Sequence, residues 1–280
     1  MTDNPDQHDI ETPETILPRF DIRHLKTDVT EGLSVSSMPV ADLLNPFTGE
    51  PTIGPLAILL DAAGGNSNHF RRSPTEWTVT SELALELSPD GIAVILANPE
   101  LPVVASARPL GPKGATALSV CTFTSGDVIV GGGTVRSFYL PASSGMPSSL
   151  PPFAAPTPRA PLTDLMAVEV RDDEQSAEGG STVLAQCVDP ILNNSLGIVN
   201  GGVASAGLEL AASAAIDRGA GQHMRTASLR VNFLRPFFSG VQSRYLGTPF
   251  RVGRSTGVGD ATAVDDSGKV ALAARVTAYL

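Results

Sequence analysis

The sequence predicts an α+β fold in which one helix packs on an antiparallel sheet, and this unit occurs twice along the chain. Three observations predict it. Residues 44–87 superimpose on residues 192–235 when 148 is added to the residue number. Each copy runs in the order extended segment, glycine-rich loop, helix and alternating strands, which is typical of an α+β layer. A stretch rich in Pro, Ser and Ala separates the copies.

The first copy is expected over residues 19–140, after a polar and flexible N-terminal arm at 1–18. An extended segment at 33–41 leads into a loop at 45–54, where Gly and Pro are frequent. A short helix follows at 55–63. The first strand is expected to begin at Trp77, and its residues alternate between apolar and polar at 83–87. Further strands are expected at 92–98, 103–109, 115–124 and 127–138.

The linker at 141–161 contains many prolines, which supply no ladder donors and interrupt helices. The second copy, at 162–280, repeats the plan with an extended segment at 182–188, a loop at 193–200, and an Ala-rich helix at 201–217. Strands follow from Thr226 to the end. A tandem duplication explains the correspondence, so the two antiparallel sheets, each with a central helix, are expected to form a pseudo-dimer within one chain.

Composition narrows the classes of function. The formal net charge is −10 and no cluster of Lys and Arg is visible, so nucleic acid is a poor candidate partner. Apolar runs are far shorter than the ~20 residues that span a bilayer, so no membrane role is expected. The N-terminal residues resemble neither a secretory signal nor a transit peptide, and a cytoplasmic location is expected.

The repeat places a carboxylate at the same point of each copy, because Asp61 meets Glu209 when 148 is added. Each lies in an otherwise apolar helical segment. A solvated helix position is the simple alternative, but its occurrence in both copies favours a functional role. The same shift brings Thr80 onto Ser228, so each carboxylate is expected to have a hydroxyl on the following strand.

Two glycines, Gly201 and Gly202, begin the second helix after Asn194 and Asn200. Free N–H groups of a first helical turn, together with the positive end of the helix dipole, suit a developing oxyanion. Two simpler interpretations stay open: the glycines permit close packing, and the asparagines form turns.

Helix geometry then limits how these groups can cooperate. Gly201 and Glu209 are ~12 Å apart along one helix, at 1.5 Å per residue. They cannot act on one carbonyl group. If a carboxylate and an oxyanion donor work together, they come from opposite copies whose helices run antiparallel, and the chain then contains two composite sites.

The second copy resembles the hotdog-fold acyl-CoA thioesterases, particularly the phenylacetate-type and 4-hydroxybenzoyl-CoA-type branch. The family pattern is an Asn, a Gly, a His-Gly-Gly run, an acidic residue nine positions after the His, and a strand with a Ser and a terminal Pro. The matching residues are Asn194, Gly197, Asn200, Gly201, Gly202, Glu209, Ser228 and Pro236. The resemblance covers residues 192–280 and, more loosely, 33–140.

This resemblance implies a double hotdog that hydrolyses an acyl-CoA through a carboxylate-activated water and a helix N-terminal oxyanion hole. One site would join Asn194, Asn200 and the Gly201 N–H to Asp61 and Thr80. The other would join Glu209 and Ser228 to the first loop, which has diverged. The Asp61 site is therefore preferred. Asn200 replaces the usual His, so only hydrogen bonding is expected of it.

Coenzyme A is expected as part of the substrate, with no separate cofactor and no metal. Arg251 and Arg254 are candidates to contact its phosphates, with Gly202 at the helix start, although solvated arginines are an equal alternative. By family resemblance, a homodimer or homotrimer of double hotdogs is expected.

Two other functions stay open from sequence. A non-catalytic acyl-CoA binding module would keep the pocket without turnover. A hotdog hydratase or dehydratase typically has an Asp-x-x-x-x-His arrangement, and neither His69 nor His223 is placed in that way. No serine-hydrolase elbow, dinucleotide fingerprint or P-loop is present in the sequence.

Overall fold

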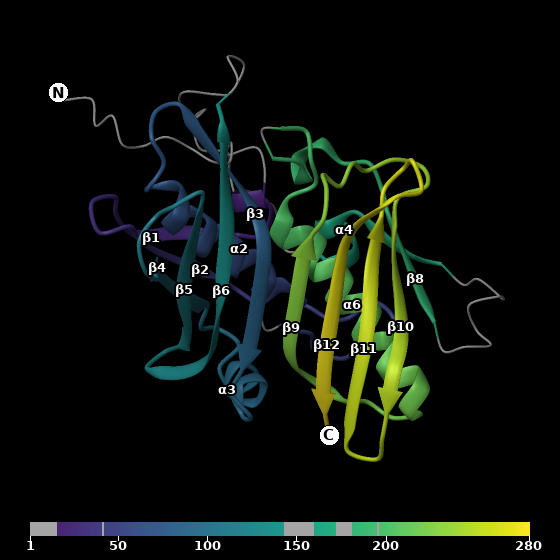
Figure 1. Cartoon of the computed structure of the whole chain (residues 1–280). Helices are drawn as coiled ribbons and strands as arrows, with labels where there is room; N and C mark the ends of the chain where they lie inside the picture. The colour runs from purple at the N-terminus through teal and green to yellow at the C-terminus, as the bar shows by residue number, and fades with distance from the viewer. Residues whose placement is uncertain (1–15, 41, 143–159, 172–180, 195) are drawn as a thin grey trace.

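A computed structural model of the chain describes residues 16–40, 42–142, 160–171, 181–194 and 196–280. Most of the predicted arm and most of the predicted linker lie outside these residues. The described part contains one antiparallel sheet of twelve strands, in the order β1-β2-β4-β5-β6-β3-β9-β12-β11-β10-β8-β7 (Figure 1). The first six strands in space come from the first half of the sequence, and the last six come from the second half.

The strands are β1 Arg23–Asp28, β2 Leu33–Met38, β3 Glu76–Leu87, β4 Val103–Pro109, β5 Thr116–Ser125, β6 Val128–Pro141, β7 Val168–Arg171, β8 Thr182–Gln186, β9 Arg225–Phe233, β10 Arg244–Val252, β11 Thr256–Val264 and β12 Val270–Tyr279. The helices are α1 Ile16–Arg19, α2 Gly54–His69, α3 Gly91–Ala97, α4 Leu162–Met166 and α6 Gly201–Ala220, with a 3₁₀ turn η1 at Pro190–Leu192.

The predicted fold class is confirmed, with the two predicted sheets joined into one. Strands β3 and β9 pair in antiparallel register, so that Leu83 lies opposite Val231 and Leu85 lies opposite Leu229. All four side chains are buried. Alternating apolar residues on these strands therefore serve a single core beneath the junction of the two halves.

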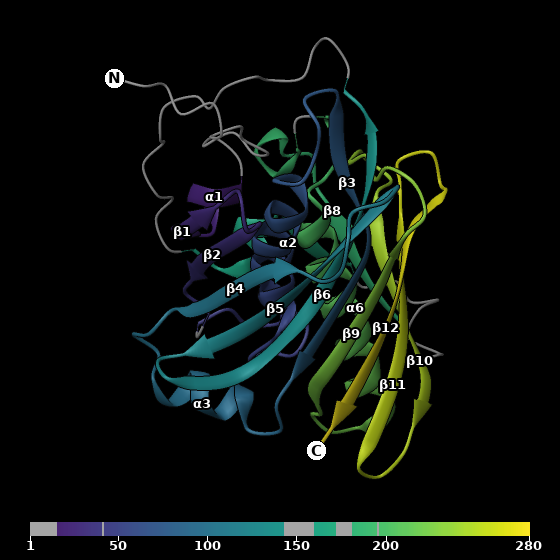
Figure 2. The ribbon, with the colours of Figure 1, turned by 60° about the vertical axis from the view of Figure 1, so that its left-hand side comes forward.

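The long helices α2 and α6 lie together on one face of the sheet, which curves around them (Figure 2). α2 packs on strands of the first half, and α6 packs on strands of the second half. The two helices run antiparallel, because the start of α2 at Gly54 approaches Ala206 while the start of α6 at Gly202 approaches Ile58. Small residues at these crossings allow the backbones to come close.

Helix α2 is longer than predicted, since it continues through Gly64 and Gly65 to His69. A glycine pair usually weakens a helix by about 1 kcal/mol per residue relative to Ala. Here packing overrides the propensity: a Cβ on Gly64 would lie 2.7 Å from Val135 Cγ2 and 3.0 Å from Ser119 Oγ. Glycine at this position lets the helix seat directly on β5 and β6.

The predicted strand at 92–98 is wrong, because this segment forms helix α3. A short apolar run bounded by polar residues does not distinguish a strand from a buried helical turn. Gly91 and Ile95, four residues apart, are the buried positions of α3 and lie on one side of it. The second half has no helix at the corresponding place, since residues 234–243 between β9 and β10 include no helix or strand.

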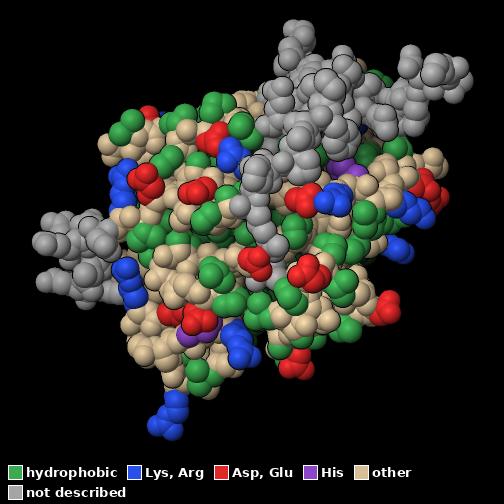
Figure 3. Space-filling model, turned by 180° about the vertical axis from the view of Figure 1, so that it is seen from behind, with side chains coloured by type: hydrophobic (Ala, Val, Ile, Leu, Met, Phe, Trp, Pro, Cys, Tyr) green, Lys and Arg blue, Asp and Glu red, His purple; other side chains and the backbone are tan. Residues whose placement is uncertain are grey.

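The molecular face turned away from the viewer in Figure 1 carries acidic and basic side chains interspersed among apolar ones (Figure 3). Basic side chains on this face are dispersed rather than gathered into a patch. Among the helices that the structure describes, none has the length and apolarity needed to cross a membrane.

Candidate active site

Asp61 lies in the middle of α2, where α2 crosses the first turn of α6. Its side chain is 8% exposed. The Thr80 hydroxyl on β3 donates to Asp61 Oδ1 at 2.8 Å, and the Gly202 N–H donates to Asp61 Oδ2 at 2.9 Å. The carboxylate of the first copy is thus held between a strand of its own copy and the helix start of the other copy.

The first turn of α6 explains the glycine pair. A Cβ on Gly202 would lie 2.6 Å from the Cα of Ile58, so Gly202 permits the close approach of the two helices. Gly202 is therefore engaged in packing and in holding Asp61, and the predicted contact between Gly202 and coenzyme A is not supported by its position. Gly201 lines the adjoining cavity, and among the described residues its N–H donates to no acceptor.

The two predicted asparagines hold the loop before α6. Asn200 Oδ1 accepts the N–H groups of Gly202 and Val203, at 2.9 and 3.2 Å, and so caps the helix. Asn194 Oδ1 accepts the N–H groups of Leu196 and Ile198, at 2.9 and 3.2 Å. Both side-chain oxygens therefore stabilise the loop before α6, as the interpretation of the asparagines as turn formers expects. Both residues also line the cavity next to Asp61.

This cavity has a volume of about 470 Å³. Its walls combine the polar groups around Asp61 and Thr80 with apolar side chains from both halves of the chain. The apolar members include Trp77, Phe138, Leu140, Leu196, Ile198, Phe233, Leu234 and Phe237. An apolar cavity with a few convergent polar groups is the usual form of a small-molecule site. We call it the Asp61 cavity.

Burial changes the acid–base properties of both carboxylates. Removal from water raises the pKa of Asp61, and the hydrogen bonds from Thr80 and Gly202 only partly oppose this rise. Burial likewise raises the pKa of Glu209, and the hydrogen bonds from the Thr52 and Thr226 hydroxyls only partly oppose this rise. A carboxylate with a raised pKa is a stronger base than a solvated one.

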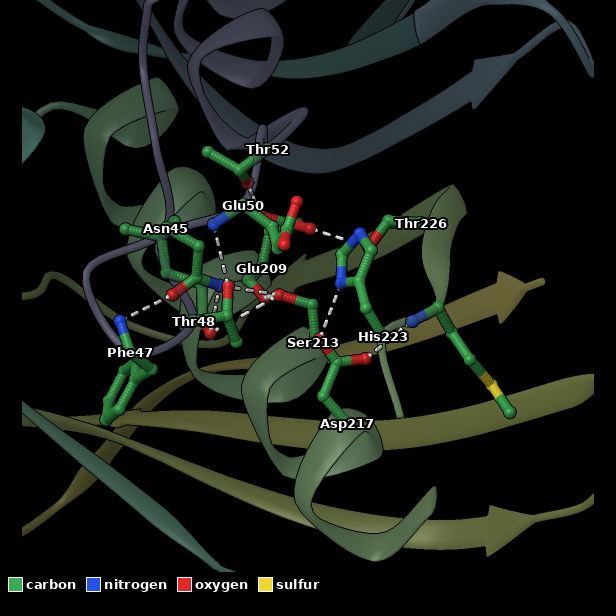
Figure 4. A network of polar contacts seen from close by, with 12 residues as sticks. Asn45, Phe47, Thr48, Glu50, Thr52, Glu209, Ser213, Asp217, His223 and Thr226 are labelled. Carbon is green, nitrogen blue, oxygen red and sulfur yellow. Dashed lines mark hydrogen bonds and ion pairs between the residues drawn. The ribbon is translucent and has the colours of Figure 1, made fainter. Parts of the chain in front are cut away.

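Glu209 is the counterpart of Asp61 in α6, and its side chain is 1% exposed. Thr226 on β9 donates to Glu209 Oε1 at 2.7 Å, and Thr52 before α2 donates to Oε2 (Figure 4). Thr52 Oγ1 in turn accepts the Gly54 N–H at 3.1 Å. Each carboxylate therefore contacts the helix start of the opposite copy, as the helix-length argument requires of two composite sites.

The hydroxyl that reaches Glu209 belongs to Thr226, whereas the sequence shift predicts Ser228. The reason is the length of the connection between helix and strand. Asp61 and Thr80 are 19 residues apart, whereas Glu209 and Thr226 are only 17 apart. The turn after α6 is thus two residues shorter, and the 148-residue shift fails on the strand. Ser228 pairs with Glu86 and Thr277 within the sheet.

Arg251 and Arg254 do not line the Asp61 cavity. Arg251 lies near the end of β10, and the Arg254 carbonyl accepts a hydrogen bond from Gln222, which follows the C-terminal end of α6. The Asp61 cavity lies at the other end of α6, where the helix begins with Gly201. The arginine that does line the cavity is Arg235, directly after β9. The contacts of Arg251 and Arg254 with phosphate therefore stay a prediction, to which their positions outside the cavity lining add no support.

A second cavity, of about 220 Å³, lies beside Glu209, and we call it the Glu209 cavity. Asp217 and His223 also line it, and His223 Nδ1 lies 2.8 Å from Asp217 Oδ2. The sequence alone does not mark His223 as a site residue, because His223 is not part of an Asp-x-x-x-x-His arrangement. Their proximity follows from the tight turn after α6, which brings residues six apart together. Among the described residues, no three His, Cys, Asp or Glu side chains gather as metal ligands.

Residues 196–272 match the model of the thioesterase superfamily, and this segment contains the start of α6, Glu209 and β9. No curated protein matches the chain.

Solved structures resemble the chain over nearly its whole length. The tesB protein of Mycobacterium avium subsp. paratuberculosis has a TM-score of 0.62 at 12% identity, covering 94% of this chain and 97% of that one. Acyl-CoA thioesterase II TesB2 from Mycobacterium marinum has a TM-score of 0.57 at 11% identity, covering 95% and 97%. A hot dog fold protein of unknown function from Alicyclobacillus acidocaldarius has a TM-score of 0.52 at 12% identity, covering 94% and 97%. This chain has the double hotdog fold, and part of its second half is similar to the thioesterase superfamily.

Proposed function

We propose that this protein hydrolyses acyl-CoA thioesters in the Asp61 cavity. One observation carries the proposal: the buried carboxylate of Asp61 faces the first turn of α6 in a cavity that is otherwise largely apolar. Thioester hydrolysis needs a base, a helix start with a free N–H and an apolar wall. At this helix start the Gly201 N–H has no acceptor among the described residues.

The N–H of Gly201 is the group best placed to hold the thioester carbonyl oxygen. As the first residue of α6, Gly201 has no acceptor within the helix for its N–H. The helix dipole adds positive potential at the same end. The N–H of the neighbouring residue, Gly202, already donates to Asp61 and to Asn200. It therefore orients the base and takes part in the helix cap, while the Gly201 N–H is left for the substrate.

Asp61 acts as the general base in this mechanism. A water molecule on the carbonyl carbon gives a proton to the Asp61 carboxylate while its oxygen adds to the carbon. The carbonyl oxygen becomes an oxyanion that the Gly201 N–H stabilises. Collapse of this intermediate breaks the carbon–sulfur bond, and Asp61 returns the proton to the departing thiolate. Thr80 keeps the carboxylate oriented throughout, through its hydrogen bond to Oδ1.

Substrate binding divides between the two ends of the cavity. Aromatic and aliphatic side chains from β3, β6 and the loop after β9 supply an apolar surface for the acyl group. Among the described residues that line this cavity, the exposed Arg235 is the cation, and it is suited to a phosphate of coenzyme A.

The test is an assay of thiol release from acetyl-, octanoyl- and phenylacetyl-CoA by the purified full-length protein. Hydrolysis of octanoyl- or phenylacetyl-CoA is expected. The alternative, an acyl-CoA binding module, predicts that CoA esters raise the melting temperature of the protein while none of them is hydrolysed. Release of free CoA from none of the three substrates contradicts the proposal.

A further inference from the structure

The Glu209 cavity contains a group that the Asp61 cavity lacks, an imidazole paired with a carboxylate. His223 and Asp217 line this cavity together with Glu209 and Thr226. Figure 4 shows one ring nitrogen of His223 directed at Asp217 and the other nitrogen at the opposite edge of the ring, away from Asp217. This geometry points to chemistry in the second cavity that does not depend on Asp61.

Asp217 fixes the tautomer and the orientation of His223. Its Oδ2 lies 2.8 Å from His223 Nδ1, and its Oδ1 accepts the Met224 N–H at 2.8 Å. A carboxylate only accepts hydrogen bonds, so the Nδ1 position of the neutral ring carries the proton. The Nε2 lone pair is then left to accept a proton, which is the arrangement of a histidine general base held by an aspartate.

The other parts of a hydrolytic site are present around this pair. Ile53 lines the cavity at the position that corresponds to Gly201, and among the described residues its N–H donates to no acceptor. Both oxygens of Glu209 accept hydrogen bonds from threonine hydroxyls, as both oxygens of Asp61 accept hydrogen bonds in the first cavity. The Glu209 cavity differs in that it also contains His223, whose Nε2 donates to or accepts from no described residue.

The size of the cavity limits the acyl group. At about 220 Å³ it has less than half the volume of the Asp61 cavity, at about 470 Å³. Helix α3 closes one side of it with Ile92, Ala93 and Leu96, and residues 234–243 in the second half provide no matching helix at the Asp61 cavity. The Glu209 cavity therefore has room for a smaller acyl group than the Asp61 cavity.

We propose that the Glu209 cavity is a second hydrolytic site, specific for short acyl thioesters, with His223 as its general base. His223 Nε2 takes a proton from water, the water oxygen adds to the thioester carbon, and the carbon–sulfur bond breaks as the proton passes to the thiolate. The inference rests on the proposed thioester chemistry and is independent of the role of Asp61.

The test compares acetyl-CoA with phenylacetyl-CoA in four single variants of the full-length protein: Asp61→Asn, His223→Gln, Asp217→Asn and the control Gln222→Ala. Gln222 is adjacent to His223, but its side chain bonds to the Arg254 carbonyl and does not line the cavity. Melting temperatures confirm that each variant is folded.

Asp61→Asn is expected to keep acetyl-CoA hydrolysis within about twofold of wild type, because the sites are separate. His223→Gln is expected to lower acetyl-CoA hydrolysis by roughly 100-fold or more, in the range of a lost general base, and to leave phenylacetyl-CoA hydrolysis unchanged. Asp217→Asn should lower the same activity and alter its pH–rate profile. Gln222→Ala should change neither activity.

Three results would overturn this inference. Loss of both activities in Asp61→Asn would mean that one site hydrolyses both substrates. Unchanged acetyl-CoA hydrolysis in His223→Gln would mean that His223 is not the base. Wild-type hydrolysis of phenylacetyl-CoA without that of acetyl-CoA would remove the second site and leave the proposed function standing. Hydrolysis of none of acetyl-, octanoyl- and phenylacetyl-CoA would remove both.

Discussion

Replacement of Gly202 by Ala tests the close crossing of α2 and α6 on which the Asp61 site depends. The added Cβ would lie 2.6 Å from the Cα of Ile58, 3.0 Å from the carbonyl oxygen of Ala57 and 3.1 Å from the Cβ of Asp61. The first two are backbone atoms of α2, which cannot rotate away as a side chain can. The helices must therefore separate for the variant to fold.

The cost can be worked from these distances. Carbon atoms in proteins pack at about 3.5–4.0 Å, so a carbon at 2.6 Å must retreat by roughly 1 Å. Overpacking of a close-packed interior destabilises by about 1–3 kcal/mol. The same movement lengthens the 2.9 Å hydrogen bond from the Gly202 N–H to Asp61, so hydrolysis should fall together with stability.

The assay is urea denaturation, with Gly65→Ala as the matched control. Gly65 lies in the same helix pair, but its nearest neighbour to an added Cβ is Asp61 Oδ1 at 3.9 Å, an ordinary contact. Ala in a helix interior is favoured over Gly by about 1 kcal/mol, so the control should raise the denaturation midpoint. Gly202→Ala should lower it. A Gly202→Ala protein as stable as wild type would refute the close crossing.

Three further predictions concern the Asp61 cavity. Because burial raises the folded-state pKa of Asp61 above its ordinary value of 3.8, its ionisation costs stability once the pH exceeds that value. Asp61→Asn should therefore melt at a higher temperature than wild type at about pH 8, and the gain should vanish as the pH falls below the ordinary value; a gain that grows in acid contradicts the burial argument. Thr80→Val removes a donor to the carboxylate, so the acidic limb of the pH–rate profile should move to higher pH and kcat should fall by roughly tenfold, about the value of one hydrogen bond to a charged group; an unshifted profile excludes this role. Arg235→Ala should raise KM roughly fivefold with little change in kcat, equivalent to about 1 kcal/mol for an exposed charge, whereas Arg251→Ala should change neither; steady-state kinetics with phenylacetyl-CoA distinguishes them.

The duplication, the fold class and the pairing of each carboxylate with the opposite helix start were accessible from sequence for a physical reason. The spacing of Gly201 and Glu209 along one helix excludes their cooperation, whatever the rest of the fold. The positions of Asp61 against Gly202 and of Glu209 against Thr52 agree with that argument.

Other features depend on three-dimensional packing and were not accessible. The turn after α6 is two residues shorter than the connection after α2, so the hydroxyl on Glu209 comes from Thr226 instead of Ser228. Helix α3 reads as a strand because its apolar run is too short for its period to be recognised. Arg235 carries no sequence signal, since only the folding of the loop after β9 brings it to the cavity.

The central claim is that Asp61 is the base of a thioester hydrolase, and single-turnover hydrolysis of phenylacetyl-CoA by Asp61→Asn tests it most directly. The account predicts a rate lowered by roughly 100-fold or more, since Asn cannot accept the proton, while a non-hydrolysable thioether analogue of the substrate still raises the melting temperature as it does for wild type. Hydrolysis by Asp61→Asn at the wild-type rate would contradict it.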